Sequence, residues 1–284
     1  EGTNAGAAYV IYGGSSGASL GVSAGTIAAS RGFAITGQAN SLLGNSVSSA
    51  GDVNGDGLAD VVVGAYNSTG AAYVVYGNST GTSISVAGGT IAASNGFKIT
   101  GKTTDAGGVV SAMGKSVSSA GDINGDGFGD LIVGAWGENG GNGAVYVVYG
   151  NPNGTGVNLS SGTIAASDGF KLSYGGTQTN TRLGASVSAA GDINGDGLGD
   201  LIVGQPYLSS FAGSYSIILG GTNYISNAAN LTGTAGNEVV LGTAGNDTLN
   251  GGGGTDRFSA GKGDDTIVLT ASDVTALAAS TGTT

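Results

Sequence analysis

The sequence Gly121-Asp-Ile-Asn-Gly-Asp-Gly-Phe-Gly-Asp130 runs directly into the apolar segment Leu131 to Val133, and this arrangement occurs three times in the chain. The copies begin at Asp52, Asp122 and Asp192, 70 residues apart. Counted from that aspartate, each copy has Asp or Asn at positions 1, 3, 5 and 9 and Gly at positions 4 and 6. We call them the first, second and third loops, and the rest of the chain repeats around them.

Side-chain oxygens at alternate positions of a tight turn point toward one place, and hard oxygen atoms are the ligands that Ca²⁺ prefers. Without a cation, carboxylates about 5 Å apart repel one another by roughly 3 kcal/mol per pair at an effective dielectric of 20. We therefore expect one Ca²⁺ in each loop. The expected side-chain ligands are Asp52, Asn54, Asp56 and Asp60; Asp122, Asn124, Asp126 and Asp130; and Asp192, Asn194, Asp196 and Asp200.

The loops are not EF-hands, although their first six residues resemble one. An EF-hand has a glutamate at position 12 and a helix on each side. Position 12 is Val63, Val133 or Val203, inside a β-branched run that predicts a buried strand. The alternative interpretation is a polar Asx-type turn that binds nothing.

Composition narrows the class of protein. The 284 residues include 60 Gly and two Pro but no Cys and no His, which is typical of many turns between short strands. The chain can form no disulfide, and a net charge of −11 with only eight Lys and Arg argues against nucleic acid as a partner. No apolar run is long enough to cross a membrane. The chain begins within a repeat and without Met, so we expect it to be part of a longer protein or a processed product.

Two further segments recur with the loops. A tyrosine-rich strand spans residues 7–13, 71–77 and 144–150 and returns in altered form at 214–220, and a Gly-Phe segment spans 25–35, 89–99 and 162–172. Each unit thus has four short strands, a pattern typical of propeller blades that stack to bury both faces. The expected fold class is all-β, with a partial blade at 1–37 and blades at about 38–101, 102–175 and 176–225.

The pattern Gly-x-Ser-Val followed by Gly-Asp-x-Asn-Gly-Asp-Gly-x-x-Asp-x-x-Val-Gly resembles the FG-GAP repeat of integrin α chains and many bacterial surface proteins. The resemblance covers residues 1 to about 220 and implies a β-propeller, incomplete or open within this chain. It also implies that the carbonyl oxygens of Leu58, Phe128 and Leu198 join the three ligand sets. The family's Gly-Ala-Pro ending is imperfect at Gly64-Ala-Tyr66, Gly134-Ala-Trp136 and Gly204-Gln-Pro206.

After Asn230 the repeat length changes to nine residues. Four consecutive nonapeptides span residues 233–268 and resemble the Gly-Gly-x-Gly-x-Asp-x-U-x repeat of RTX proteins, where U is apolar. The resemblance implies a short parallel β-roll over residues 226–270, with Asp247, Asp256 and Asp265 as ligands for one or two more Ca²⁺, and Glu238 in place of the first aspartate. The alternative is a flexible Gly/Asp-rich linker. Residues 271–284 are expected to be a tail.

We expect no enzymatic activity in this chain, because it has neither His nor Cys and most carboxylates belong to the loops. Glu138 is expected to be a solvated surface residue, and Trp136 a packing residue. The predicted function is a secreted or cell-surface calcium-binding module for adhesion or a matrix, with a protein or glycan ligand and type I secretion implied by the RTX resemblance. The alternative is a self-assembling structural subunit of an extracellular fibre or layer. We expect the strand edge near residues 7–13 to be covered either by upstream sequence or by another copy of the chain, and the second case would give such a subunit.

Overall fold

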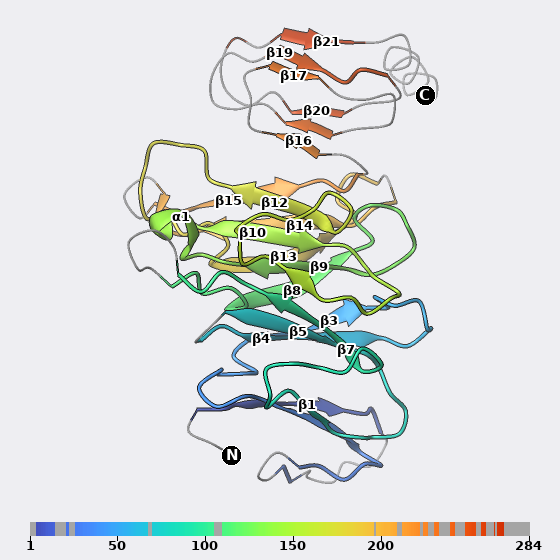
Figure 1. Cartoon of the computed structure of the whole chain (residues 1–284). Coiled ribbons are helices and arrows are strands. Elements are labelled where there is room, and N and C mark those ends of the chain that lie inside the picture. Colours follow the sequence, from blue (N-terminus) through green and yellow to red (C-terminus); the bar gives the residue numbers. More distant parts are fainter. Residues whose placement is uncertain are drawn as a thin grey trace. The chain divides into compact units, whose positions relative to one another are not determined.

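The computed structural model describes most of the chain and shows strands almost throughout (Figure 1). It describes residues 4–14, 21–22, 26–67, 70–104, 110–195, 197–208, 212–221, 224–226, 230–232, 239–241, 248–253, 257–259, 264 and 266–269. Two compact units are present. The first contains Glu1–Gly121, Gly127–Gly191 and Leu201–Ile218, and the second contains Asp122–Asp126, Asp192–Asp200 and Leu219–Thr284.

The described strands of the first unit form four open sheets, each with two free edges. The first sheet has the order β1 (Ala7–Ile11), β2 (Gly32–Thr36), β6 (Ile84–Ser85), and the fourth has the order β13 (Ser186–Gly191), β14 (Asp200–Gln205), β15 (Ser214–Ile218). The second sheet has the order β11 (Val157–Asn158), β7 (Gly96–Thr100), β5 (Ala71–Val75), β4 (Asp60–Ala65), β3 (Val47–Gly51). The third sheet has the order β12 (Gly169–Ser173), β10 (Ala144–Val148), β9 (Asp130–Gly134), β8 (Ser116–Gly121). These sheets are the blades that the repeats predict, and the all-β fold class of open propeller blades is confirmed.

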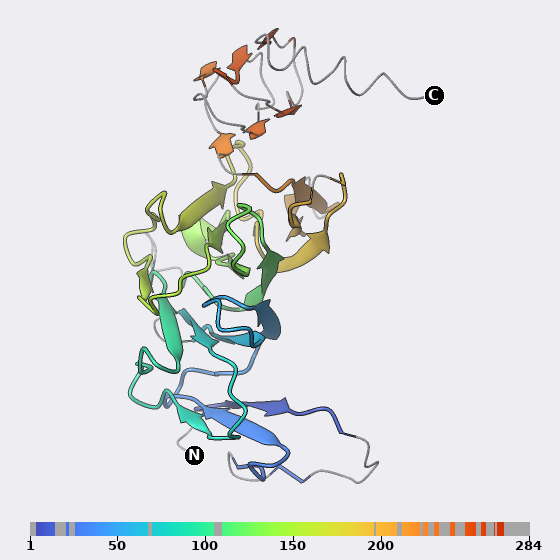
Figure 2. The same ribbon diagram turned by 90° about the vertical axis from the view of Figure 1, so that its right-hand side faces the viewer.

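The blades bury their middle strands on both faces. Every residue of β5, β9 and β10 is buried, as expected of strands covered by a neighbouring blade on each side. The first core cluster joins Val74 and Phe97 of the second sheet to Leu131 and Tyr146 of the third. Each fully buried valine or leucine contributes about 1.5–3 kcal/mol, so this contact between blades is a main source of stability. In Figure 2 the same sheets follow one another from blue through green to yellow.

Glycine and serine set the spacing between blades at their inner strands. A methyl group placed on Gly64 would lie 1.9 Å from the carbonyl oxygen of Gly114, so only glycine allows this approach. The hydroxyl of Ser46 donates to that same oxygen at 2.8 Å, and Ser116 donates to the carbonyl oxygen of Gly184 in the next blade. The Gly-x-Ser-Val motif therefore serves the contact between blades.

Two short strands bind one blade to the next. β6 lies between β5 and β7 in the sequence, but it pairs in parallel with β2, where Ile35 faces Ile84. β11 lies between β10 and β12 and pairs in the same way with β7. Each two-residue strand covers the outer edge of the preceding blade, a feature that the sequence analysis did not predict.

The second unit carries two parallel sheets of short strands. One has the order β16 (Tyr224–Ser226), β18 (Val239–Leu241), β20 (Arg257–Ser259), and the other β17 (Asn230–Thr232), β19 (Thr248–Asn250), β21 (Thr266–Val268). The register places Val240 opposite Phe258 and Leu249 opposite Ile267, so the apolar positions of alternate nonapeptides stack on each other. This is the pairing of a parallel β-roll.

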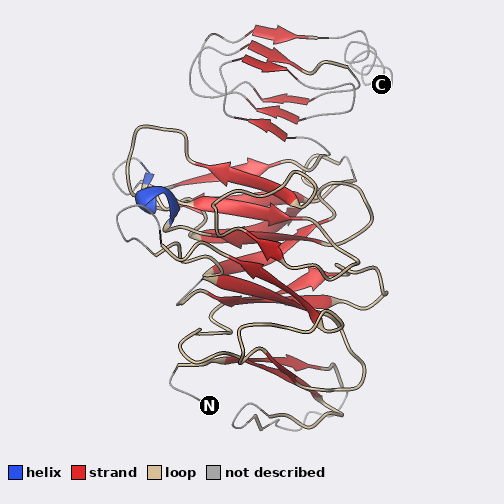
Figure 3. Ribbon diagram, viewed as in Figure 1, coloured by secondary structure: helices blue, strands red, loops and turns tan. Residues whose placement is uncertain are grey.

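The one helix with both ends among the described residues is the four-residue α1 (Glu138–Gly141), drawn in blue in Figure 3. None of the described helices is long and apolar enough to cross a membrane. Several predicted features lie outside the described residues: the ligands Asp196, Asp247, Asp256 and Asp265, the substituted Glu238, and the tail at 271–284.

Candidate metal centres

The first loop joins β3 to β4, with Asp52 just after one strand and Asp60 at the start of the other. The register of β3 against β4 shifts between Ser49 and Gly51, which turns the chain into the loop. Gly55 and Gly57 have φ values of 77° and 84°, a conformation that glycine adopts without strain. Loop positions 4 and 6 are therefore glycines for backbone reasons.

Asp52 organises the backbone of this loop. Its Oδ1 accepts hydrogen bonds from the N–H of Gly55 at 2.7 Å and of Asp56 at 3.1 Å, and its Oδ2 accepts one from Gly57 at 2.8 Å. Three N–H groups directed at one carboxylate fold the loop tightly around that side chain.

Asn54 and Asp56 complete a polar cluster with Asp52. The amide of Asn54 donates to Oδ2 of Asp56 at 2.9 Å, and its own oxygen accepts the N–H of Asp56 at 2.9 Å. Oδ1 of Asp56 accepts the N–H of Leu58 at 2.8 Å. The structure thus brings together the predicted ligands at positions 1, 3 and 5.

Asp60 has a different environment. Its side chain is 1% exposed, and its oxygens accept the N–H groups of Val53 at 2.9 Å and Gly77 at 2.8 Å. Burial raises the pKa of Asp60 to about 6, the two N–H bonds oppose the shift, and the charges of Asp56 and Asp52 add to it. Among the described residues no three His, Cys, Asp or Glu side chains are placed to hold a metal ion together. Asp60 as a fourth ligand therefore stays a prediction.

The other two loops repeat this geometry where they are described. In the second, Oδ1 of Asp122 accepts the N–H groups of Gly125 at 2.7 Å and Asp126 at 3.0 Å, and Asn124 donates to Asp126 at 2.8 Å. Asp130 is fully buried and accepts the N–H of Gly150.

In the third loop, Asp192 accepts the N–H groups of Gly195 at 2.7 Å and Gly197 at 2.9 Å. Asp200 is buried, and its oxygens accept the N–H groups of Ile193 at 2.7 Å and Gly220 at 2.8 Å. Asn194 is exposed, and Asp196 lies outside the described residues. The repeated environment of Asp60, Asp130 and Asp200 shows that position 9 anchors the loop to its own blade.

The donor set fits a hard divalent cation. Positions 1, 3 and 5 supply carboxylate and amide oxygens, and the negative charges of Asp56 and Asp52 add to the effect of burial in raising the pKa of Asp60. A cation with oxygen ligands would relieve that repulsion. Ca²⁺ in such a place is a structural ion, and its binding free energy adds to folding.

Comparison with known families agrees with the geometry. The FG-GAP repeat family matches residues 43–75, 113–148 and 183–218, which contain the three loops with their flanking strands. The chain carries three FG-GAP repeats. The RTX calcium-binding nonapeptide repeat matches residues 232–267 in four copies, so the β-roll belongs to a class of repeat that binds calcium. No curated protein matches the chain. Both families are non-catalytic structural modules, and together they indicate a calcium-binding extracellular repeat protein.

Aromatic and cationic side chains alternate across the segments that follow the loops, an arrangement that the repeat pattern did not indicate. Lys115 lies 5.2 Å from the ring of Tyr66 and 5.5 Å from that of Trp136, and Arg182 lies 4.6 Å from Trp136 and 4.4 Å from Tyr207. Each such contact contributes about 0.5–1 kcal/mol at a partly exposed site. Trp136 therefore has a packing role, between Lys115 of its own FG-GAP repeat and Arg182 at the start of the next one.

The expectation for Glu138 was wrong. Its side chain is 1% exposed, Lys171 lies 2.9 Å from its Oε2, and the hydroxyl of Tyr146 donates to both carboxylate oxygens. Lys171 comes from β12, 33 residues away in the sequence, and provides the charge that lets a carboxylate remain buried. Sequence spacing gave no signal of this pair.

Proposed function

We propose that the chain is a secreted or cell-surface adhesion or matrix module whose FG-GAP blades are held in their stacked form by Ca²⁺. The three loops bind one ion each through positions 1, 3, 5 and 9 and the carbonyl oxygen of position 7, and the RTX turns bind one or two more through Asp247, Asp256 and Asp265. The ligand is a protein or a glycan surface. A net charge of −11 disfavours nucleic acid.

One observation carries this proposal: the first loop is part of the contact between blades. The carbonyl oxygen of Asp52 accepts the N–H of Gly129 at 2.7 Å, and that of Val53 accepts the N–H of Asn151 at 2.9 Å. Both donors belong to the following blade. An ion that orders the loop therefore also stabilises the packing of the two blades. Ca²⁺ binding would in this way make the ligand-binding surface of the blades more rigid.

The coupling between Ca²⁺ binding and folding is also compatible with secretion of the chain from the cell. A chain that needs Ca²⁺ to order its repeats stays unfolded at low cytosolic Ca²⁺ and folds outside the cell, where Ca²⁺ is millimolar. The proposed route is type I secretion.

Solid-phase binding tests the adhesive function. The chain is applied to arrays of glycans and extracellular-matrix proteins in millimolar Ca²⁺, and again after chelation. Retention on a defined subset that is lost on chelation and restored by Ca²⁺ supports adhesion. Absence of retention under every condition, with the chain folded and loaded with Ca²⁺, contradicts it.

A second function is favoured by one observation. β1 is at the edge of its sheet and pairs only with β2 among the described strands, whereas β5 and β10 are each paired on both sides. A free edge of this kind suits a subunit that assembles with copies of itself.

A further inference from the structure

Five alternating aromatic and cationic side chains form a continuous row across the blades, in the order Tyr66, Lys115, Trp136, Arg182, Tyr207. We call it the cation–aromatic row. Lys115 lies over the first two rings and Arg182 over the last two, so each ring is linked to the next by a cation. The row draws on three successive FG-GAP repeats, and a ligand that contacts its whole length therefore spans several blades.

The row lies at the end of the blades that is farther from the calcium loops. β4 begins at Asp60 of the first loop and ends just before Tyr66, and Lys115 directly precedes β8, whose other end enters the second loop. A strand of six residues is about 20 Å long at ~3.3 Å per residue. Charges in solvent are screened over about 8 Å at physiological salt, so the loop aspartates have little effect on a charged ligand at the row.

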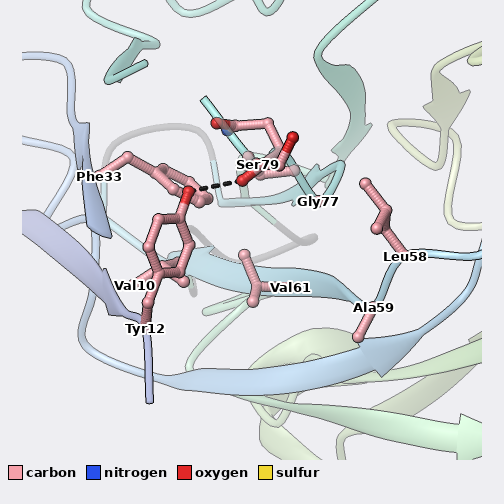
Figure 4. Close-up of a pocket in the computed structure, with 10 residues that line it drawn as sticks. Val10, Tyr12, Phe33, Leu58, Ala59, Val61, Gly77 and Ser79 are labelled. Carbon is pink, nitrogen blue, oxygen red and sulfur yellow. Dashed lines mark hydrogen bonds between the residues drawn. The ribbon is translucent and has the colours of Figure 1, made fainter. Parts of the chain in front are cut away.

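The loop end of the blades carries a different kind of surface. A cavity of about 420 Å³ lies there between the first and second sheets, and Val10, Tyr12 and Phe33 are among its lining residues (Figure 4). The hydroxyl of Tyr12 donates to the carbonyl oxygen of Asn78. The described residues that line this cavity include no Lys, Arg, Asp or Glu. A charged ligand is therefore better suited to the row than to this cavity.

Arg182 has donors without acceptors. Its Nε is buried and has no hydrogen-bond partner, and within the described ranges nothing accepts from the rest of its guanidinium. The contacts with the rings of Trp136 and Tyr207 engage the charge and the faces of the guanidinium. Its N–H groups lie in the guanidinium plane and remain as donors for a ligand. A buried donor without an acceptor is costly, and a bound anion would remove that cost.

The turn that carries Arg182 is held in place by the preceding blade. Four hydrogen bonds of 2.7–3.1 Å join residues 180–183 to Gly141 and Asn142. The φ value of Arg182 is 56°, in the left-handed region that a long side chain rarely adopts. The guanidinium is therefore positioned before any ligand arrives, which lowers the entropic cost of binding.

Lys115 also has no acceptor in the part of the chain that the structure describes, and it is exposed. Cations that lie over rings elsewhere in the blades do have acceptors. Lys171 pairs with Glu138, and Lys98 donates to the carbonyl oxygen of Gly89 at 2.9 Å. The two cations of the row thus differ from the two inside the blades, because each could pair with an anion supplied by a ligand.

We propose that the cation–aromatic row binds an acidic polysaccharide, with one uronate carboxylate on the N–H groups of Arg182 and another acid group of the same chain at Lys115. This inference deepens the adhesive function and rests on it, because it names the class of glycan that the module binds. It also assigns the contact to the end of the blades opposite the calcium loops.

Shape and charge favour an acidic sugar chain over an acidic peptide. The planar N–H groups of Arg182 match the planar carboxylate, which can accept two parallel hydrogen bonds. Two cations on one row suit a ligand whose acid groups repeat along its length. The rings beside the cations suit a ligand unit with a flat apolar face and an acid group at its edge, as a uronate has. An acidic peptide carries its acid groups on flexible side chains, whose ordering costs more entropy.

Titration of tryptophan fluorescence tests the proposal, because Trp136 is the only tryptophan and belongs to the row. The probe is a short oligogalacturonide, added to the full chain in millimolar Ca²⁺, and its binding should saturate. A neutral galactose oligomer of equal length has the sugar rings without the acid groups, and a short oligoglutamate has the acid groups without the rings. Each should bind at least about tenfold more weakly. Equal binding of either control would overturn the assignment to an acidic sugar.

Variants of the two cations locate the site. Arg182→Gln should weaken binding of the oligogalacturonide at least about tenfold, and Arg182→Lys should restore only part of the affinity because an ammonium lacks the planar N–H groups. Lys115→Gln should weaken binding about two- to fivefold. Arg31→Gln is the matched control: it removes the same charge beside Tyr12, at the other end of the blades, and should change the affinity by less than about twofold.

Circular dichroism checks that each variant folds, and Arg182→Lys and Lys115→Gln carry the test if Arg182→Gln does not. Affinity that the row variants leave unchanged, or a folded and calcium-loaded chain that does not bind the oligogalacturonide, would overturn the inference. The same variants on the glycan and protein arrays separate it from the adhesive function. Retention on other ligands that Arg182→Gln leaves intact would refute this site alone, whereas no retention on any ligand would refute the adhesive function.

Discussion

Replacement of Asp52 by alanine probes both roles of the first loop. The carboxylate accepts three backbone hydrogen bonds. At the low end of the usual 0.5–1.5 kcal/mol for each bond, because the site is half-exposed, their loss costs about 1.5 kcal/mol without metal. The variant should therefore unfold more easily even in the presence of a chelator.

Calcium should widen the difference. For a site with a Kd of about 10⁻⁴–10⁻³ M, about 10 mM Ca²⁺ stabilises the folded state by about 1.4–2.7 kcal/mol, and Asp52→Ala removes that share too. The total loss with Ca²⁺ is then about 3–4 kcal/mol. Asp52→Asn is the matched control, because it keeps an acceptor oxygen for the backbone while it removes the charge.

Urea denaturation followed by tryptophan fluorescence measures these differences, since Trp136 is the only tryptophan. Asp52→Ala should be destabilised in both media and Asp52→Asn mainly in Ca²⁺. If both variants lost equal stability with and without Ca²⁺, the loop would be a structural turn and not a metal site.

Three further predictions follow from single environments. Val53→Asn should cost about 2–4 kcal/mol because Val53 is fully buried, whereas Ile193→Asn, at the same position of the third loop, should cost less than about 0.5 kcal/mol because Ile193 is exposed; equal losses in thermal unfolding would contradict this difference in burial. Glu138→Ala should destabilise by about 3 kcal/mol, because it leaves Lys171 without its carboxylate, and Glu138→Gln with Lys171→Met should recover part of that loss; a loss below about 1 kcal/mol in urea would show that the pair is not needed. In chelator, Asp60 with a pKa of about 6 binds its proton more tightly in the folded state than in the unfolded state, where the value is 3.8. Its stabilising contribution is complete below pH 3.8 and lost as the pH rises through about 6, so thermal stability should rise from pH 7 to pH 5 without Ca²⁺, and a fall there would contradict the assigned environment.

The loops and blades could be predicted because their signals are local. Asp and Asn at alternate positions predict the side-chain cluster of the loop, and glycines at positions 4 and 6 predict its positive φ angles. The run of valines from Val61 to Val63 predicts a strand that is buried on both faces. Repetition then extended each local signal along the chain.

Features that cross between blades could not be predicted from one unit. β6 and β11 pair with a blade other than their own, and two residues are too few to show a strand pattern. Glu138 is buried beside Lys171, which comes from β12, and Arg182 reaches Trp136 from the start of the next repeat.

Calcium stoichiometry tests the central claim most directly. The chain, dialysed against chelator and then titrated with Ca²⁺ in a calorimeter, should bind at least three ions. The triple variant Asp52→Ala, Asp122→Ala, Asp192→Ala should bind three fewer, with the RTX sites unchanged. An equal number of ions in the variant and the wild type would contradict the assignment of the three FG-GAP loops as calcium sites.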